Sequence, residues 1–321
     1  EGINSHLKEL KEETFSKYDI VTVGEANGVS ADEADHWVAE DEGTFNMIFQ
    51  FEHLNLWNYE EGQGFDVKAY KDVLTNWQNS LEGKGWNALF IENHDIPRVV
   101  STWGNDKEYL TECAKAFGAI YFLQKGTPFI YQGQELGMTN VSFHSIDEID
   151  DCSTLDEYQV ALDAGLTPES AFKAVVPYSR DNARTPFQWD ATANAGFTTG
   201  TPWLKVNPNY TDINAAEQAN RPDSMYHWYK ELIALRKNPE YKDVVVYGEV
   251  VPYKEEQTNL MAYYRKGTDR TLLVIANYQH DAQDVVLPGT YKKVLMNNLE
   301  TLDLNGDILH MPGYQVVIFE M

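Results

Sequence analysis

The sequence predicts an α/β fold, namely the C-terminal half of a (β/α)8 barrel followed by an all-β antiparallel domain. Three observations support this prediction. Short apolar runs alternate with amphipathic helical patterns up to about residue 239, which is typical of βα units and a parallel sheet. Only four such units can be counted, whereas a closed barrel needs eight strands and about 250 residues. After residue 240, short β-rich runs are separated by turn residues, which favours an antiparallel domain.

Apolar spacing predicts the elements of the first domain. Strands are expected over residues 19–24, 45–51, 87–91 and 128–131, and helices from about residue 3 and over 66–81, 107–123 and 224–237. The helix over 66–81 has the clearest pattern, because its apolar residues Val67, Tyr70, Leu74, Trp77 and Leu81 share one face. The first helix has Asn4 or Ser5 in position to cap its N-terminus.

The segment 137–222 is rich in Asp, Asn, Thr, Gly and Pro, and we expect a long loop there with one short helix near 168–174. A loop of this length in a compact domain is most often functional. The β-rich runs of the second domain cover 243–247, 260–264, 271–276 and 315–319. We therefore place the half barrel at residues 1–239 and a β-sandwich at residues 240–321.

Charge and composition exclude several classes of function. The chain carries 25 basic and 50 acidic residues, a net charge of −25, which would repel nucleic acid and an anionic membrane surface. No apolar run reaches the ~18 residues of a membrane span. Cys113 and Cys152 make no disulfide framework, and we find no His/Cys spacing typical of zinc, no phosphate-binding Gly-rich loop and no dinucleotide fingerprint. We expect no metal, nucleic-acid or membrane partner.

The beginning of the chain suggests a fragment or a processed protein. The first residue is Glu1 rather than Met, and the chain opens directly into a helical pattern. We therefore expect an upstream part that these 321 residues do not contain. No secretory signal is visible, which favours a cytoplasmic protein, although a signal peptide would lie in that upstream part.

Two apolar runs end in carboxylates. The first is Val21-Thr-Val-Gly-Glu25-Ala-Asn-Gly28, and the second is Phe90-Ile-Glu-Asn-His94-Asp95-Ile-Pro-Arg98. The C-terminal ends of parallel barrel strands share one face, so Glu25 and Asp95 are expected to meet in one cleft. Two carboxyl groups in a cleft are the equipment for cleaving a glycosidic bond.

At this point four segments together resemble a known family. They are Gly24-Glu25-Ala-Asn-Gly28, Asn93-His94-Asp95-x-Pro97-Arg98, Gly126-Thr-Pro-Phe-Ile-Tyr-Gln-Gly133 and Ser179-Arg180-Asp-Asn-Ala-Arg184-Thr-Pro-Phe-Gln-Trp189. In this order and at these separations they resemble the α-amylase superfamily, glycoside hydrolase family 13, in its oligo-1,6-glucosidase and glucan 1,6-α-glucosidase branch. The resemblance covers nearly the whole chain and matches the C-terminal half of such enzymes, including part of their TIM barrel.

The resemblance implies a role for each residue of the candidate site. Glu25 would be the general acid that protonates the leaving oxygen and later the base that activates water. Asp95 would hold substrate hydroxyls and stabilise the oxocarbenium-like charge, and His94 would donate a hydrogen bond to the same sugar. Arg184, or in second place Arg180, would help close the pocket around the non-reducing glucose, since a guanidinium pairs well with a carboxylate there.

Other nearby residues receive weaker or structural assignments. Asn27 lies two residues past the acid and is a candidate contact for the second sugar. Arg98 and Glu135 are expected to be structural, Arg98 as an ion-pair partner. Glu52 and His53 follow a strand and would either line the cleft or cap it.

The catalytic nucleophile implied by the resemblance is absent from the sequence. It is an Asp in a Gly-x-Arg-x-Asp strand motif one strand before the acid, and residues 1–24 hold no such motif. The upstream Asp-x-x-x-Asn-His motif and the N-terminal loop that holds calcium in some members are also missing. We expect no cofactor in this chain, a structural calcium only in the missing part, and no hydrolysis by the isolated chain. Its partners would be the oligosaccharide substrate and the missing N-terminal half of the barrel.

The resulting hypothesis is a retaining α-glucosidase that releases glucose from the non-reducing end of α-1,6-linked isomalto-oligosaccharides or dextran. Other specificities of the same family stay open: α-1,4-glucosidase, trehalose-6-phosphate hydrolase and sucrose isomerase. A phosphorylated substrate would need a basic cluster near the pocket, and none is visible in the sequence around Glu25 or Asp95. An alternative of another class is a non-catalytic carbohydrate-binding remnant that lost its chemistry.

Overall fold

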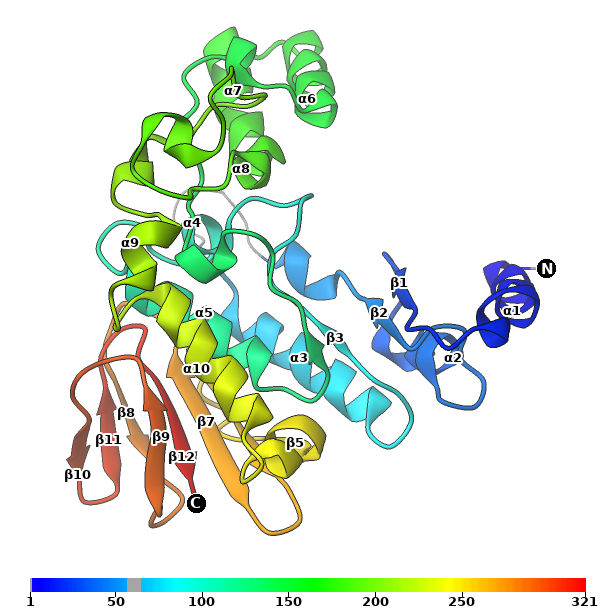
Figure 1. Ribbon diagram of the computed structural model, residues 1–321, viewed down its shortest axis with the longest axis vertical. Helices are drawn as coiled ribbons and strands as arrows, with labels where there is room; N and C mark the ends of the chain where they lie inside the picture. Colours follow the sequence, from blue (N-terminus) through cyan, green and yellow to red (C-terminus); the bar gives the residue numbers. More distant parts are fainter. Residues whose placement is uncertain (1, 57–64) are drawn as a thin grey trace.

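The computed structural model describes residues 2–56 and 65–321. Figure 1 shows its arrangement, with colours that follow the sequence from the N-terminus to the C-terminus. The helices are α1 (Ile3–Glu13), α2 (Ala34–Val38), α3 (Val67–Leu81), α4 (Val99–Thr102), α5 (Leu110–Phe122), α6 (Cys152–Asp163), α7 (Pro168–Val175), α8 (Asp181–Arg184), α9 (Ala215–Ala219) and α10 (Met225–Lys237). The strands are β1 (Val23–Glu25), β2 (Met47–Phe49), β3 (Ala88–Leu89), β4 (Thr127–Pro128), β5 (Glu249–Pro252), β6 (Leu260–Lys266), β7 (Thr271–Asn277), β8 (Gln283–Val286), β9 (Lys293–Asn297), β10 (Asp303–Asn305), β11 (Ile308–Met311) and β12 (Val316–Glu320). Within the described residues, no helix has the length and apolar character needed to cross a membrane.

Four short strands form the parallel part of the fold. β1 pairs with β2, with Gly24 opposite Ile48, and β3 pairs with β4, with Ala88 opposite Thr127. Each strand is shorter than the apolar run that predicted it, but the four strands lie within the four expected segments except that β1 extends one residue further and β4 begins one residue earlier. Their parallel direction agrees with the predicted βα units.

Side chains join the pair β1–β2 to the pair β3–β4. The Phe49 ring contacts the rings of Phe90 and Phe129, with centroids 5.1 and 4.7 Å away. His53, just after β2, donates through Nε2 to the Phe90 carbonyl at 2.9 Å and accepts at Nδ1 from the Gln50 side-chain amide at 2.8 Å. Both nitrogens of the neutral ring are thereby satisfied, and the ring is buried. His53 therefore supports the strands and is not among the residues that line the 410 Å³ cavity described below.

The buried neutral His53 predicts a loss of stability in acid. Burial lowers the pKa of its imidazole from 6.5 to about 4, against the opposing effect of the Phe90 carbonyl. Between these pH values only the unfolded chain binds the proton, so stability is complete above pH 6.5 and falls towards pH 4. His53 should therefore contribute about 2 kcal/mol of destabilisation between pH 7 and pH 5.

Urea unfolding of the wild type and of His53→Gln at both pH values measures this effect. The variant should lose less free energy of unfolding than the wild type when the pH falls from 7 to 5. The exposed His6→Gln is the matched control and should keep the wild-type pH dependence. Equal pH slopes in the wild type and His53→Gln would contradict the assignment.

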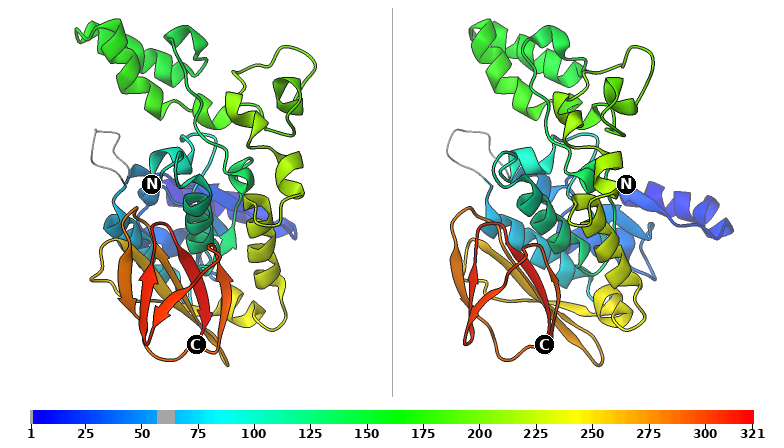
Figure 2. Two further views of the ribbon diagram at one scale, coloured as in Figure 1. Left: turned by 90° about the vertical axis from the view of Figure 1, so that its left-hand side faces the viewer. Right: turned by 60° about the vertical axis from the view of Figure 1, so that its left-hand side comes forward.

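The helices that cover the parallel strands follow their apolar faces. α3 begins after Asp66, whose carboxylate accepts the Ala69 N–H at 2.9 Å, and the five apolar residues that predicted it are all buried. α5 and α10 pack against each other and bury the residues around Phe117 and Leu232. The expected cap of α1 is wrong, since the N-cap residue is Gly2 and makes no side-chain hydrogen bond. α1 buries none of its side chains and projects from the body (Figures 1 and 2).

Residues 137–222 form a helical lobe rather than a long loop with one helix. Besides the expected helix, which is α7, this segment contains α6, α8 and α9. It stands over one end of the parallel strands, at the top of Figure 1. α6 escaped prediction because only Thr154 of its residues is buried, so the helix shows no apolar stripe.

The C-terminal residues form two antiparallel sheets that share a core. The larger has the strand order β5-β6-β7-β12-β9, and the smaller has the order β10-β11-β8. Side chains of the larger sheet alternate between two cores. Ile275 and Phe319 face the smaller sheet, whereas Val274 and Ile318 pack into the core that contains α5 and α10. The central strands are therefore buried on both faces, which explains their unbroken apolar runs.

One predicted strand of this region is wrong. The run Asp243-Val-Val-Val-Tyr247 is a short π-helix, and the first strand of the sheet begins at Glu249, after this helix has ended. The buried Arg265 on β6 donates to the carbonyls of Val245 and Gly248, at 2.8 and 2.6 Å, and to the carbonyl of Leu123. Those contacts fasten the sheet to the π-helix and to the end of α5.

Candidate active site

Glu25 is the last residue of β1 and is exposed at the C-terminal end of the strand. It lies opposite Phe49 of β2 in the parallel register, and the Ala26 N–H extends the pairing with a hydrogen bond to the Phe49 carbonyl at 3.1 Å. The turn that follows carries the exposed Asn27 and then Gly28, whose φ of +85° suits glycine. Strand pairing thus holds the backbone of Glu25, while its side-chain carboxylate stays accessible to solvent.

His94 and Asp95 lie on the turn that follows β3. The Asn93 side-chain oxygen accepts the Asp95 N–H at 2.8 Å, a local bond typical of Asn turns. His94 Nε2 lies 3.3 Å from Asp95 Oδ2, and the Asp95 side chain is 36% exposed. The two predicted residues therefore present their polar atoms together.

Both predicted arginines reach Asp95 from the lobe. Arg184 Nη2 donates to Asp95 Oδ1 at 2.7 Å, and its Nε donates to the His94 carbonyl at 2.8 Å. Arg180 Nη1 lies 3.7 Å from the same Asp95 oxygen. Arg184 thus fixes both the side chain of Asp95 and the backbone before it.

A second carboxylate, Asp151, holds Arg180. It accepts from Arg180 Nε at 2.8 Å, from the Arg180 N–H at 3.2 Å and from the Thr154 hydroxyl at 2.7 Å. Burial opposes ionisation of Asp151, but these hydrogen bonds prevail and lower its pKa to about 2. The buried Asp181 in turn accepts the N–H groups of Asp150 and Asp151, at 2.7 and 3.1 Å. Sequence reasoning missed Asp151, because it is one of several acidic residues in that stretch.

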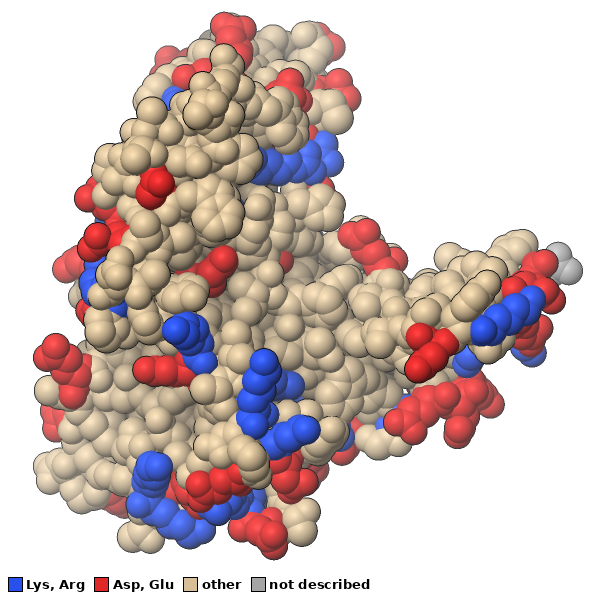
Figure 3. All heavy atoms as spheres, viewed as in Figure 1, with Lys and Arg blue, Asp and Glu red and all other residues tan. Residues whose placement is uncertain are grey.

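A cavity of about 410 Å³ lies at the ends of the parallel strands. Glu25 and His94 both line it, together with aromatic residues such as Phe49, Phe90 and Tyr131. It is large enough for a sugar ring and combines apolar walls with a few polar groups, as binding sites commonly do. On the face shown in Figure 3, the surface is hollowed between the lobe and the N-terminal arm, which is formed by α1, β1 and α2.

Asp95 and Asn27 are not among the residues that line the 410 Å³ cavity, so the structure brings Glu25 together with His94 and places Asp95 beside His94.

A buried ion pair lies beneath the turn that carries His94 and Asp95. Arg98 Nη1 lies 3.1 Å from Glu92 Oε2, and the two side chains are 1% and 2% exposed. Glu92 also accepts the Val99 N–H at 2.8 Å, while Arg98 donates to the carbonyls of Gln132 and Ala183 at 2.8 and 3.2 Å. Burial raises the pKa of Glu92, although Arg98 and the Val99 N–H oppose this effect. Arg98 therefore has the structural role expected of it, and Glu92, which lines the cavity, was missed.

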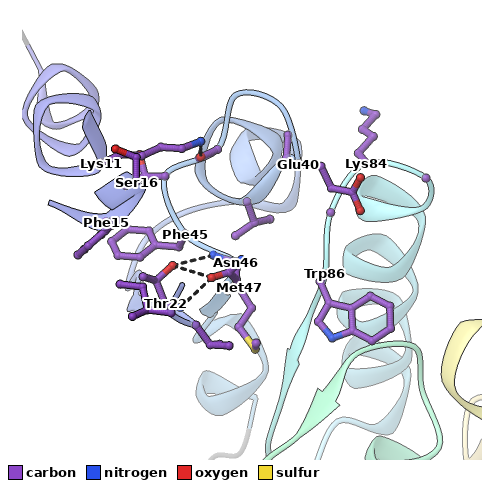
Figure 4. A pocket seen from close by; sticks show the side chains of 18 of the residues that line it. Lys11, Phe15, Ser16, Thr22, Glu40, Phe45, Asn46, Met47, Lys84 and Trp86 are labelled. Atoms are coloured by element: carbon purple, nitrogen blue, oxygen red, sulfur yellow. Dashed lines mark hydrogen bonds between the residues drawn. The ribbon is translucent and has the colours of Figure 1, made fainter. Parts of the chain in front are cut away.

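A larger cavity lies elsewhere. It measures about 780 Å³ and is lined by residues of the N-terminal arm and the starts of the strands, among them Phe45, Asn46 and Trp86 (Figure 4). There, Thr22 donates to the Asn46 side chain through its backbone N–H at 2.8 Å and its hydroxyl at 3.0 Å. None of the predicted site residues lines this cavity. Size alone therefore does not identify the site.

No metal centre is found in the described part of the chain. Residues 2–56 and 65–321 contain no group of three or more His, Cys, Asp and Glu side chains arranged to hold an ion. The polar groups at the end of β3 are instead paired with arginines, as described above.

Comparison with known proteins gives consistent matches. Residues 2–248 match the family described as "Alpha amylase, catalytic domain", and residues 260–318 match "Alpha-amylase SusG C-terminal domain". A probable oligo-1,6-glucosidase of Bacillus subtilis (strain 168) is 49% identical over 94% of this chain and 54% of that protein. The trehalose-6-phosphate hydrolase of Bacillus licheniformis has a TM-score of 0.90 at 37% identity, over 99% of this chain and 59% of that one.

A further solved structure, the isomaltulose synthase of Erwinia rhapontici NX5, has a TM-score of 0.91 at 34% identity, over 99% of this chain and 58% of that one. The chain thus spans between half and three fifths of the length of these three proteins. The family match covers most of the chain. The chain belongs to the α-amylase family, glycoside hydrolase family 13.

Proposed function

We propose that this chain carries the general acid and the charge-stabilising aspartate of a retaining α-glucosidase. The observation that carries the proposal is the 410 Å³ cavity at the strand ends, into which Glu25 and His94 both open in a chain of the α-amylase family. The four βα units would be the second half of an eight-stranded barrel. In support, β1 pairs with β2 alone among the described residues, and Val21 on the approach to β1 is 74% exposed.

In the proposed mechanism, Glu25 protonates the glycosidic oxygen while a carboxylate attacks the anomeric carbon, and it later takes the proton of the water that releases the sugar. Asp95 accepts sugar hydroxyls, and its negative charge stabilises the positive charge that develops at the anomeric carbon. Arg184 keeps Asp95 in place, and His94 donates to a hydroxyl of the same ring. We expect this reaction to need no organic cofactor. The lack of a cofactor and the cytoplasmic location both stay predictions from the sequence.

The attacking carboxylate is proposed to come from outside these 321 residues. Besides Glu25, Glu92 is the carboxylate that lines the cavity in the described part of the chain. Glu92 is bound to Arg98 and to the Val99 N–H and is buried, so its oxygens are not available for attack. The isolated chain should therefore show no turnover.

The proposed substrates are α-1,6-linked isomalto-oligosaccharides or dextran, cut from the non-reducing end. The support is the identity of 49% with a probable oligo-1,6-glucosidase. A second candidate is hydrolysis of trehalose 6-phosphate, favoured by the likeness to that hydrolase. The structure does bring Arg180 and Arg184 close to Asp95, whereas the sequence shows no basic cluster around Asp95 itself. Both are bound to aspartates, however, which argues against their binding a phosphate.

The test is a hydrolysis assay on isomaltose, maltose, trehalose 6-phosphate and sucrose. The isolated 321-residue chain should turn over none of them. Joined to the remaining portion that its longer relatives possess, it should release glucose from isomaltose, with the α-anomer formed first when the reaction is followed by NMR. Turnover by the isolated chain would contradict the proposal, and so would an assembled protein that binds isomaltose without cleaving it.

A further inference from the structure

Trp203 in the lobe is a large apolar side chain held in an exposed position. Trp203 is 71% exposed, yet its indole N–H donates a hydrogen bond to Asp150 Oδ2 at 2.6 Å. Its neighbours are fixed, because Leu204 is buried and Lys205 Nζ bonds the Ser142 carbonyl and Glu148, each at 2.9 Å. The ring therefore has a set orientation while its apolar surface stays in contact with water.

The same contacts connect Trp203 to the candidate active site. Asp150 precedes Asp151, which binds Arg180, and Arg180 approaches Asp95 to 3.7 Å. The N–H groups of both acidic residues are held by the buried Asp181, so this connection does not depend on a loose loop. Trp203 thus sits on the part of the lobe that also supplies the arginine next to Asp95.

The chemistry around the ring favours a neutral ligand rich in hydroxyl groups. A sugar ring presents C–H groups that pack on an aromatic face and hydroxyls that donate to a carboxylate. Asp150 is exposed beside the ring, and its carboxylate accepts the indole N–H of Trp203. The basic Lys205 nearby is already paired with Glu148, so an anionic ligand would find no free cation at that residue.

We propose that Trp203 and Asp150 form a binding platform for an α-linked gluco-oligosaccharide, where the sugar units farther from the cleaved bond stack on the indole and donate to Asp150. This inference rests on the proposed function, because its ligand is an α-linked gluco-oligosaccharide like the proposed substrate. Binding at Trp203 is nevertheless independent of the chemistry at Glu25, which allows the two proposals to fail separately.

The experiment titrates the 321-residue chain with isomaltohexaose and, separately, with glucose, using saturation-transfer NMR. Trp203→Ala should weaken isomaltohexaose binding by roughly 3- to 10-fold and leave glucose binding unchanged. Trp203→Phe, which keeps an aromatic face, should retain most of the affinity. Tyr247→Ala is the control, since Tyr247 is also an exposed aromatic residue but lines the larger cavity of Figure 4.

Three results would overturn the platform: no binding of isomaltohexaose by the wild-type chain, equal affinity in the wild type and Trp203→Ala, or an equal loss in Tyr247→Ala. Sedimentation analysis adds a fourth, because a dimer that Trp203→Ala dissociates would show that the ring binds a second copy. If Glu25→Gln keeps hydrolytic activity in the assembled protein, the proposed function fails while the binding result at Trp203 stands.

Discussion

Replacing Glu25 by glutamine is expected to lower kcat on isomaltose by roughly 10²- to 10⁴-fold, the usual contribution of a positioned general acid. The amide has nearly the same shape as the carboxyl group but cannot protonate the leaving oxygen. The exposed position at the end of β1 means that the exchange should leave the fold intact. The measurement needs an active enzyme that carries these 321 residues together with the portion that its longer relatives possess.

The leaving group distinguishes a lost acid from a damaged site. An aryl α-glucoside with an acidic phenol departs without full protonation, so Glu25→Gln should slow its first step far less than that of isomaltose. Glu33→Gln, an exposed carboxyl group outside the cavity lining, is the matched control and should keep the wild-type rate. Equal losses on both substrates would show that Glu25 positions the sugar rather than donating a proton.

Replacing Arg98 by methionine is expected to cost about 3–5 kcal/mol of unfolding free energy, as removal of one partner from a buried ion pair usually does. The side chain of Glu92 would be left almost completely buried without its cation. The carbonyls of Gln132 and Ala183 would lose a donor at the same time. Urea unfolding at pH 8 measures the loss.

A double variant separates the ion pair from simple packing. Glu92→Gln combined with Arg98→Met removes the stranded charge and should recover about 2 kcal/mol relative to Arg98→Met alone. The cost of Arg98→Met should also be smaller at pH 5, because the lone carboxyl group can take up a proton there. Lys173→Met breaks an exposed pair with Glu169 and should leave stability unchanged. If Arg98→Met were as mild as Lys173→Met, the buried pair would have no special role.

Elements with a strong apolar pattern were predictable from the sequence. The helix expected over 66–81 is α3 (Val67–Leu81), and the helix expected over 224–237 is α10 (Met225–Lys237). In α3 a capping Asp66 and a buried face give the same answer, so local and tertiary preferences agree. The central strands β7 and β12 were predictable because burial on both faces leaves a continuous apolar run.

The secondary-structure predictions failed where the local sequence pattern does not match the packing of the segment in the fold. Three consecutive valines favour a strand, but Val244 and Val245 are buried within a π-helix next to β6. α6 has the opposite problem, because Leu155 and Val160 are exposed and leave no periodic core face. In the site, the strand-end rule found Glu25 and His94, which line one cavity. It could not find Asp151, because the role of that residue depends on Arg180, 29 positions away in the sequence. It could not find Glu92, because the sequence does not show that this carboxylate is buried with Arg98 as its partner.

The separation of Asp95 from Arg184 along the chain has a consequence for when the candidate site forms during folding. The two residues are 89 positions apart, and the supporting contact of Arg98 with the Ala183 carbonyl spans 85. Contacts of such long range pay the entropy of loop closure first and form slowly. During synthesis the aspartate therefore leaves the ribosome without a native counter-charge, and it acquires one only when the later segment has been made and folded back.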